Sequence, residues 1–345
     1  MSGRAISMGN ATPRVTQATF AGARRVLVTS ACMLVLVHAR GATAAESYPS
    51  KPIRLVHGYP GSSTEANARY IGSKLTELTG QQVLVDARAG ATGTIAAEHV
   101  AKSAPDGYTL LITPSSALGS TPHLRKVPFN TLRDFAPIAP VATFGYLLAA
   151  HPNVPARNAK ELIALAKSRR VVFTYGTTAV GSAYHLAGVL FSSMAGIEML
   201  HVPYPQSGSA ALVDLISGRI DLGLNSPVFL LPHVRDGKLR AIGVTSPRRM
   251  QAAPDVPTIA ESGIPGFQMV GWQGIVAPGK TPPEIIAQLH AALQKILAMP
   301  DTRKRWDDLG LELVSATPEQ FAAMLAADYE RYGKLIQKIG SRIVQ

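Results

Sequence analysis

The sequence predicts an α/β protein whose two lobes face each other across a ligand-binding cleft. Three observations support this fold class. Short apolar runs alternate with segments of helical periodicity, this alternation starts afresh in the second half of the chain, and two extended segments lie where the chain would cross between the halves. Alternating strands and helices form parallel sheets with right-handed crossovers, and such sheets bind ligands beyond the carboxyl ends of their strands.

The first lobe opens with a strand at residues 53–56, which is followed by a loop rich in Gly, Ser and Thr and then by a helix. Gly80 is expected to end this helix. Its apolar face consists of Ala68, Ile71, Leu75 and Leu78. Strands at residues 83–85 and 108–112 follow, with a helix over residues 94–102 between them. This order predicts one parallel βαβαβ sheet.

The second lobe repeats this rhythm. Helices and strands alternate through residues 159–167, 171–175, 182–194, 199–202, 210–216 and 220–224. Residues 142–150 are expected to carry the chain to this lobe, and residues 269–277 are expected to bring it back. The first lobe would then comprise residues 45–146 and 268–345, and the second lobe residues 147–267.

Two helices are expected after the return crossing. One opens with TPPE at residues 281–284 and the other with TPEQ at residues 317–320. Each has Thr in position to cap the helix, Pro at the first helical position, and Glu or Gln three residues after the Thr, which is the pattern of a capping box. These helices would complete the first lobe.

The first 44 residues have the charge and hydropathy order of a secretory signal. Arg24 and Arg25 precede an apolar run at residues 26–37, and the small residues ATAA follow at 42–45. This run of about 12 residues is shorter than the roughly 20 that span a membrane, which favours cleavage over the alternative of a retained anchor. Cys32 is the only cysteine, so the exported chain would have no disulfide and no cysteine ligand.

Composition excludes several classes of protein. The chain has 345 residues, of which 46% are hydrophobic and 16% charged, so neither long disorder nor a coiled coil is expected. The formal net charge is +12, but five basic and no acidic residues lie in residues 1–44, so the remainder carries +7. The basic residues are dispersed, and the densest cluster, at residues 303–305, is followed at once by WDD. Nucleic-acid binding is therefore not expected.

Three loops place glycine and hydroxyl residues between a predicted strand and a predicted helix, at residues 59–65, 175–182 and 204–209. Glycine lets the backbone approach a ligand, and hydroxyl groups donate hydrogen bonds. A helix N-terminus adds free N–H groups with a partial positive charge. One such loop is ordinary helix capping. Three of them at corresponding places in two lobes predict a carboxylate site that needs no arginine.

Other chemistries have little support. Residues 274–281 match the nucleotide-binding pattern G-x-x-x-x-G-K-T, but Pro282 and Pro283 remove two N–H donors and Thr281 is expected to be an N-cap. The chain has no G-x-S-x-G elbow and no zinc-ligand spacing among its 9 histidines, and the acids at its predicted strand ends and turns lack the spacing of a glycosidase carboxylate pair. An exported enzyme would depend on Ser182 or His185.

Seven segments together indicate a family. They are YPSKPIRLV at residues 48–56, APDGYTL at 104–110, HVPY at 201–204, LPHVRDGKLR at 231–240, VTS at 244–246, PDVPT at 254–258 and GIPGF at 263–267. These segments resemble the Bug-type substrate-binding proteins of tripartite tricarboxylate transporters, in the family's order. The resemblance implies a periplasmic binding protein type II-like fold, with two Rossmann-like lobes joined by two crossover strands. It also implies periplasmic delivery of a small carboxylate to a membrane permease, without catalysis.

The resemblance and the three loops imply a ligand site without a catalytic residue, a cofactor or a metal. Its residues would be Tyr59, Pro60, Gly61, Ser62, Ser63, Thr64, Ser115, Ser116, Thr177, Thr178, Gly181, Ser182, Ser207, Gly208 and Asn225. Two segments depart from the family pattern. Glu65 stands where the family usually has Asp, and Asn225-Ser226 replaces the usual Asp-Asn. The missing acid at position 225 is expected to disfavour a ligand amine.

Four aromatic side chains could stack on a ligand, namely Tyr59, Tyr175, Tyr184 and Trp272. A monomer is expected, because the cleft must open and close. A sensor subunit that presents its ligand to a membrane kinase would have the same fold and the same site. This alternative and the exported hydrolase remain open at the level of sequence.

Overall fold

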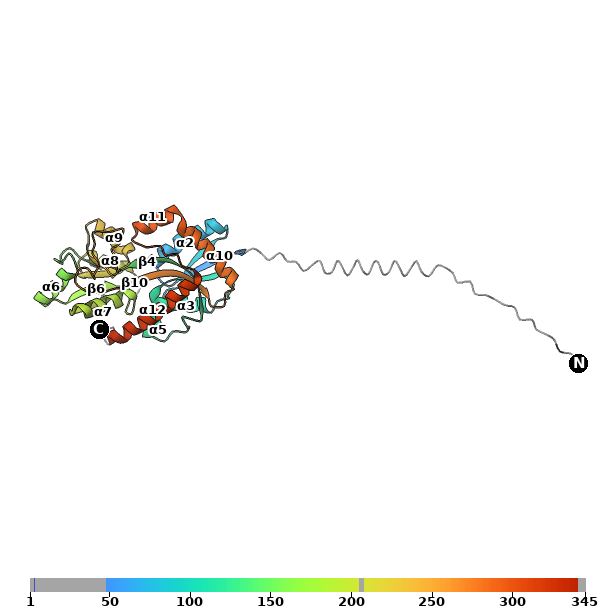
Figure 1. The fold of residues 1–345 in the computed structure, drawn as a ribbon, viewed down its shortest axis with the longest axis horizontal. Helices are drawn as coiled ribbons and strands as arrows, with labels where there is room; N and C mark the ends of the chain where they lie inside the picture. The colour runs from blue at the N-terminus through green and yellow to red at the C-terminus, as the bar shows by residue number, and fades with distance from the viewer. Residues whose placement is uncertain (1–2, 4–47, 205–207, 341–345) are drawn as a thin grey trace. The chain divides into compact units, whose positions relative to one another are not determined.

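The computed structural model describes residues 3, 48–204 and 208–340 (Figure 1). Residues Pro49–Gln345 form one compact unit. The expected secretory signal at residues 1–44 lies outside the described residues except for Gly3, and Ser207 also lies outside them. None of the helices within the described ranges is long and apolar enough to cross a membrane.

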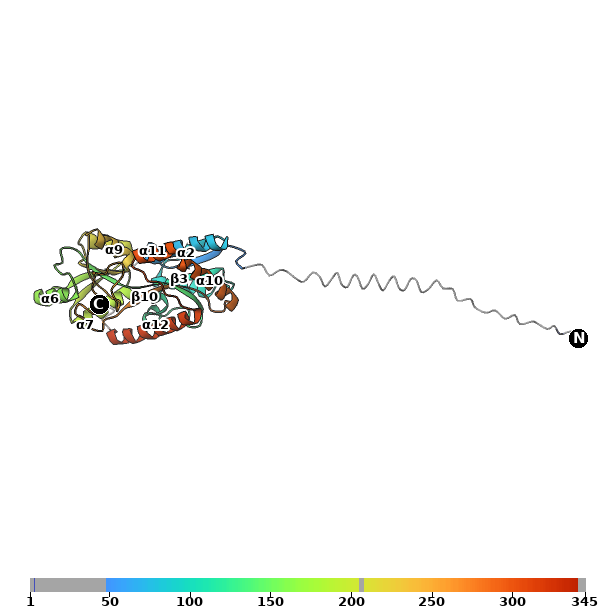
Figure 2. The ribbon, with the colours of Figure 1, turned by 45° about the horizontal axis from the view of Figure 1, so that its top comes forward.

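The first sheet has the strand order β2-β1-β3-β10-β4. Its strands are β1 (Ile53–His57), β2 (Val83–Ala87), β3 (Thr109–Pro114), β4 (Phe135–Gly145) and β10 (Val270–Pro278). Its longer helices are α2 (Ser63–Thr79), α3 (Thr94–Ala101), α10 (Pro283–Ala298), α11 (Pro300–Asp308) and α12 (Pro318–Ile339). Three short turns of helix complete this lobe, namely η1 (Ala91–Gly93), α4 (Ser115–Leu118) and α5 (Thr121–Leu124). In both orientations of Figures 1 and 2, α12 runs along the outside of this lobe.

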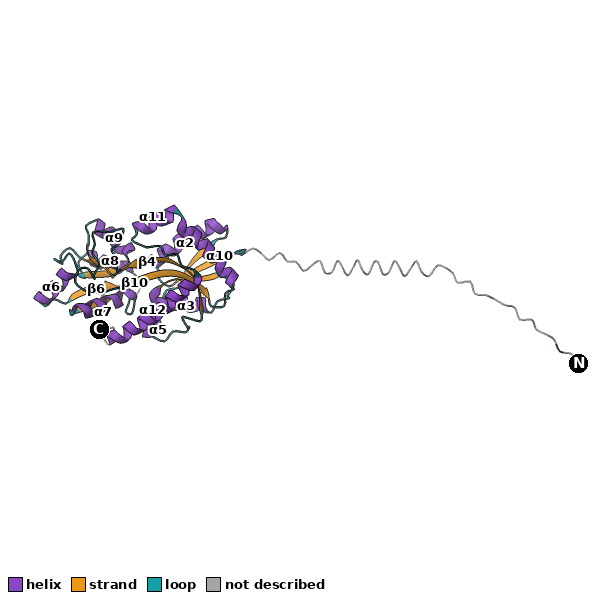
Figure 3. Cartoon of the chain, in the orientation of Figure 1, coloured by secondary structure: helices purple, strands orange, loops and turns teal. Residues whose placement is uncertain are grey.

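The second sheet has the strand order β7-β6-β8-β5-β9. Its strands are β5 (Leu147–Ala150), β6 (Phe173–Thr177), β7 (Met199–Pro203), β8 (Leu222–Asn225) and β9 (Arg240–Val244). Its helices are α6 (Ala159–Arg169), α7 (Ala183–Ala195), α8 (Gly208–Ile216) and α9 (Pro227–Arg235). In both lobes the strands lie inside and the helices outside (Figure 3).

Both sheets are mixed, which corrects the expectation of parallel sheets. Strand β1 pairs in parallel with β2 and β3, whereas β10 is antiparallel to β3 and β4. Likewise β6 is parallel to β7 and β8, whereas β5 is antiparallel to β8 and β9. The reason is the path of the chain. Strands β5 and β10 each enter their sheet from the other lobe and therefore run away from the joint. The strands beside them run toward the joint.

The joint is narrow and hydrogen bonded. Only Tyr146 separates β4 in one sheet from β5 in the other. Its N–H donates to Thr245 Oγ1 at 2.6 Å, and its carbonyl oxygen accepts from Thr245 N at 2.9 Å. Met269 N donates in turn to the carbonyl of Thr245 at 2.8 Å. The two connecting segments therefore lie side by side where the lobes meet.

Each lobe has its own apolar core. In the first lobe, Phe321 and Leu325 of α12 pack with apolar residues of β1, β3 and β10. In the second lobe, Leu215 of α8 and Leu230 of α9 pack with residues of β5 and β9. Burial of these faces stabilises each lobe by the hydrophobic effect, so the lobes themselves form firm supports for the loops at the joint.

The two expected capping boxes have different outcomes. Thr317 caps α12 as predicted, because its Oγ1 accepts from Gln320 N and its N–H donates to Gln320 Oε1. The expectation for α10 is wrong. That helix has Pro282 at its N-cap position, and the hydroxyl of Thr281 donates to the carbonyl of Pro278 at 2.8 Å instead. With a proline at each of two successive positions, the helix starts one residue later than the pattern predicts.

Candidate functional site

A cavity of about 40 Å³, room for a few water molecules, lies between the two sheets where the chain crosses. The first lobe contributes Tyr59, Ser62, Ser63, Thr64, Pro114, Ser115, Ser116, Phe144, Gly271 and Trp272. The joint contributes Tyr146, and the second lobe contributes Thr178, Ser182, Ala183, Tyr184, Asn225 and Phe229. Both lobes therefore form the walls of the same cavity.

The start of α2 forms one wall. Ser62 has extended backbone angles and caps the helix, since its Oγ accepts from Thr64 N at 3.2 Å and from Glu65 N at 3.4 Å. Ala66 N is the first to bond within the helix, to the carbonyl of Ser62. Of the N–H groups in the first turn, that of Ser63 is left without a helical partner beside the cavity.

The start of α7 forms the opposite wall. Ser182 caps this helix by accepting from His185 N at 3.2 Å, and Leu186 N bonds to the carbonyl of Ser182. The N–H groups of Ala183 and Tyr184 are thus left without helical partners, and both residues line the cavity. Two helix N-termini from different lobes consequently present backbone donors and partial positive charge to one enclosed space.

The lining is polar but uncharged. None of the residues that line the cavity within the described part of the chain is Asp, Glu, Lys, Arg or His. Burial raises the pKa of Tyr59, Tyr146 and Tyr184 above that of a free phenol, so all three remain protonated. Asn225 Oδ1 accepts from Ser226 N at 2.7 Å, which leaves the amide hydrogens of Asn225 to donate. The site is therefore rich in neutral hydrogen-bond donors.

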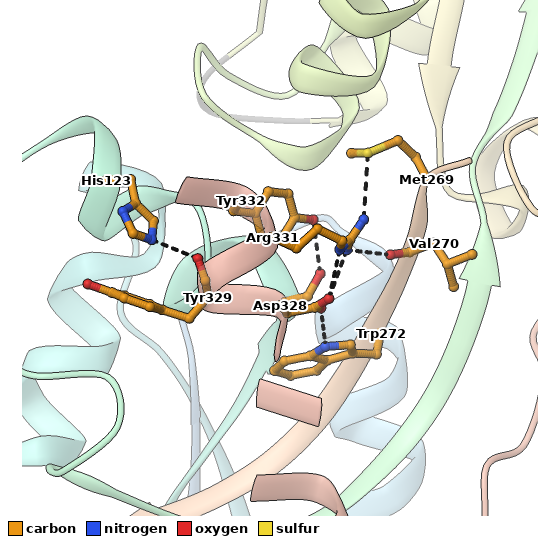
Figure 4. A network of polar contacts seen from close by, with 9 residues as sticks. His123, Met269, Val270, Trp272, Asp328, Tyr329, Arg331 and Tyr332 are labelled. Atoms are coloured by element: carbon orange, nitrogen blue, oxygen red, sulfur yellow. Dashed lines mark hydrogen bonds and ion pairs between the residues drawn. The ribbon is translucent and has the colours of Figure 1, made fainter. Parts of the chain in front are cut away.

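A polar network on α12 holds Trp272 in the wall of the cavity (Figure 4). The indole Nε1 donates to Asp328 Oδ2 at 2.7 Å. Arg331 donates to Asp328 Oδ1 at 2.8 Å and to the carbonyl of Val270 at 3.4 Å. The carboxylate and the guanidinium pair with each other, so the network orients the indole while adding little net charge near the cavity.

Nine of the residues expected in the ligand site line this cavity. They are Tyr59, Ser62, Ser63, Thr64, Ser115, Ser116, Thr178, Ser182 and Asn225. Of the aromatic candidates, Tyr184 and Trp272 also line it, whereas Tyr175 does not.

The remaining expected residues lie elsewhere. Pro60 and Gly61 are outside the lining, and Gly61 N donates to Glu65 Oε2 at 2.7 Å. That bond and the neighbouring Arg69 hold the pKa of Glu65 below its usual range. Glu65, which departs from the family pattern, therefore bonds to the backbone of the loop that precedes its helix. Thr177 and Gly181 are also outside the lining, whereas the surroundings of Gly208 are not among those that the structure describes.

Sequence reasoning missed six of the lining residues. They are Pro114, Phe144, Tyr146, Ala183, Phe229 and Gly271. Ala183 carried a usable signal, because it lies in the first turn of the helix predicted over residues 182–194 and so offers an unbonded N–H. Tyr146 and Phe144 carried none, since aromatic residues in apolar strands are ordinarily core residues.

The described residues do not have the geometry that a hydrolase, a nucleotide-binding loop or a metal site would need. The ring of His185 points its Nδ1 at Gly181 N, 3.0 Å away, while Ser182 Oγ accepts from the backbone of His185, so Ser182 and His185 do not form a nucleophile–base pair. Gly274 lies within β10 and pairs with β3 and β4, which is unlike a phosphate-binding loop. No cluster of three or more metal-ligating side chains occurs in the described ranges.

Residues 67–341 match the model of a family described as tripartite tricarboxylate transporter family receptor, TctC. The chain belongs to this family. It is 35% identical over 317 residues to a UPF0065 protein encoded in the tcbD-tcbE intergenic region of Pseudomonas sp. strain P51, which covers 91% of this chain and 94% of that protein. It is 33% identical over 306 residues to BugT of Bordetella pertussis, covering 87% and 93%. The expected Bug-type TctC family is thereby confirmed.

Several solved structures share this fold. One, described as a periplasmic transporter, is 32% identical with a TM-score of 0.81, and the match covers 86% of this chain and 100% of that one. Rpa4515 of R. palustris, solved with adipate, is 31% identical with a TM-score of 0.80, covering 85% and 98%. MatC of Rhodopseudomonas palustris, solved with bound malate, is 29% identical with a TM-score of 0.77, covering 84% and 100%.

Proposed function

We propose that this chain is a periplasmic receptor that binds a small carboxylate in the cavity between its lobes and delivers it to a membrane permease. The observation that carries the proposal is the convergence of the N-termini of α2 and α7, from different lobes, on a cavity lined by neutral donors. The adipate and malate in the two structures from R. palustris support the same ligand class.

Binding would favour the closed arrangement of the lobes, because a ligand held by both walls gains contacts only when the walls approach. The narrow joint at Tyr146 and Thr245 is the place where such a motion would be absorbed. A permease that recognises the closed form would then take the ligand only from loaded receptors. This cycle contains no chemical step and uses no catalytic residue, cofactor or metal.

The lining also sets the expected selectivity. N–H groups, hydroxyls and the amide hydrogens of Asn225 can all donate to an anion. An ammonium group would need acceptors or a carboxylate, and the side chain at position 225 is an amide with its oxygen already in use. The receptor is therefore expected to prefer acids without an amino group. Asn225→Asp is expected to weaken the binding of dicarboxylates such as adipate and malate.

The proposal is tested by calorimetric titration of the purified protein with adipate, malate, citrate, aspartate and ATP. The decisive variant is Ala183→Pro, which removes one N–H donor at the first position of α7, where proline is well tolerated. Ser182 already has φ −64° and ψ 157°, angles compatible with a following proline. Loss of one hydrogen bond to a charged group predicts binding about 10- to 100-fold weaker.

Ala159→Pro is the matched control, because Ala159 is the first residue of α6, is buried, and does not line the cavity. It is expected to bind the acid as the wild type does. Absence of binding to every acid, or binding to ATP alone, would refute the proposed function. Equal affinity of Ala183→Pro and the wild type would refute the role assigned to α7.

A further inference from the structure

Gln273 lies on β10 directly behind the wall of the cavity and is 1% exposed. Its Nε2 donates to Ser63 Oγ at 3.0 Å and to Thr64 Oγ1 at 3.2 Å. Its Oε1 accepts from Asn67 Nδ2 at 2.7 Å. Ser63 and Thr64 line the cavity, whereas Gln273 does not. A buried chain of hydrogen bonds thus runs from the interior of α2 through Gln273 to two hydroxyls of the site.

The direction of these hydrogen bonds determines whether the hydroxyls of Ser63 and Thr64 donate to a ligand or accept from it. A hydroxyl has one proton to donate, and its oxygen can accept. Because both oxygens accept from the amide nitrogen of Gln273, neither proton points toward Gln273. Both hydroxyl protons are left for partners on the cavity side, where the phenol of Tyr184 is one partner of Ser63 and a ligand in the cavity is within reach of both hydroxyls. On the other side of Gln273, Asn67 Nδ2 donates to Gln273 Oε1, and the chain of hydrogen bonds ends there because the buried Asn67 Oδ1 has no partner within the described ranges.

We propose that Gln273 is a positioning residue that makes Ser63 and Thr64 hydrogen-bond donors to the ligand and so selects an anion on this side of the cavity. This inference rests on the proposed function, in which the cavity binds a carboxylate. Reversal of the amide chain would have the opposite effect. Ser63 and Thr64 would then donate to Gln273 and offer only lone pairs to the ligand, which would repel an anion.

The substitution Gln273→Glu separates the two directions. A carboxylate has the same shape as the amide but accepts only, so Ser63 and Thr64 must donate to it and turn their protons away from the ligand. Burial beside an anionic ligand raises the pKa of this new carboxyl, and at about pH 9 its ionised form also repels the bound acid. In the proposed direction, adipate or malate should bind on the order of 100-fold more weakly to this variant at about pH 9. In the reversed direction only the charge of the carboxylate weakens binding, and Gln273→Met, which would free both hydroxyl protons, should bind the acid more tightly than the wild type does.

The pH profile distinguishes positioning from a general structural role. Lowering the pH from about 9 to about 6 protonates part of the new buried carboxyl, which can then donate as the amide does, so affinity should recover about tenfold or more. The wild-type protein should show no such recovery. The titratable groups near the first turn of α2, which are His57, Glu65 and Arg69, are the same in both proteins, so their effects cancel in the comparison.

Calorimetric titration of both proteins at the two pH values, with a urea unfolding curve for each, completes the test. Equal affinities of Gln273→Glu and the wild type overturn the inference and leave the proposed function standing. Failure of the wild type to bind any acid overturns the proposed function, and this inference with it. If Gln273→Glu does not fold, Gln273→Met decides: it should bind about tenfold more weakly at both pH values, and unchanged affinity overturns the inference.

Discussion

Two neighbouring histidines in the second lobe predict a specific loss of stability in acid. The rings of His185 on α7 and His201 on β7 have centroids 4.1 Å apart. His185 Nδ1 accepts from Gly181 N at 3.0 Å, and His201 Nε2 shares a hydrogen bond of 2.7 Å with Thr177 Oγ1. Burial lowers the pKa of His185 to about 4, and burial together with the neighbouring His185 lowers that of His201 to about 3.

Proton linkage determines that acid lowers, and does not raise, the free energy of unfolding. In the unfolded chain both side chains titrate near their ordinary pKa of 6.5, so below that pH the unfolded state binds protons that the folded state does not. The stability that both neutral rings contribute is complete above pH 6.5 and decreases as the pH falls toward 4. Each pKa unit is worth about 1.4 kcal/mol, so at pH 5 each histidine lowers the free energy of unfolding by about 2 kcal/mol, or about 4 kcal/mol together.

Urea unfolding at about pH 7.5 and about pH 5 measures this difference. The double variant His185→Asn, His201→Gln keeps an acceptor for Gly181 N and a hydrogen-bonding group for Thr177, but it does not titrate in this range. It should lose most of the pH dependence. His233→Gln, on α9 outside this pair, is the control and should retain it. Wild-type pH dependence in the double variant would refute the reasoning.

Two further predictions concern packing and the binding signal. A Cβ at Gly188 in α7 would overlap the ring of Tyr175, so Gly188→Ala should lower the free energy of unfolding by about 1–3 kcal/mol, whereas Gly72→Ala in α2, where the nearest atom would be 3.3 Å away, should cost little in the same urea assay. Trp272 lines the cavity and Trp306 is fully buried elsewhere. Ligand-induced change in tryptophan fluorescence should therefore disappear in Trp272→Phe and persist in Trp306→Phe.

Much of the site is visible in the sequence because helix starts are local features. Ser62 and Ser182 were recognisable as residues between a strand and a helix, and the structure places both at N-caps beside the cavity. A cap depends on the residue itself and on N–H groups two or three positions later, so a single short segment contains all the information. Gly80 ends α2 in the left-handed conformation, as expected, for the same reason.

Sequence reasoning did not find the hydrogen bonds that join distant segments of the chain. Gln273 meets Ser63 across 210 positions of sequence, and Trp272 meets Asp328 across 56. Nothing in the neighbourhood of either residue identifies its partner. The antiparallel direction of β5 and β10 was missed on similar grounds, because periodicity locates a strand but does not say from which lobe the chain enters it.

The sequence by itself determined the alternation of strands and helices, the end of α2 at Gly80, the cap of α12 at Thr317 and the family to which the chain belongs. These features depend on short-range periodicity and on motifs that stay in order along the chain. Only the tertiary structure decided which loops share a cavity, which donors remain unpaired there and which way the hydroxyls of Ser63 and Thr64 face. The physical reason is that hydrogen bonds between buried side chains depend on position and angle in space, and folding brings those groups together from remote parts of the chain.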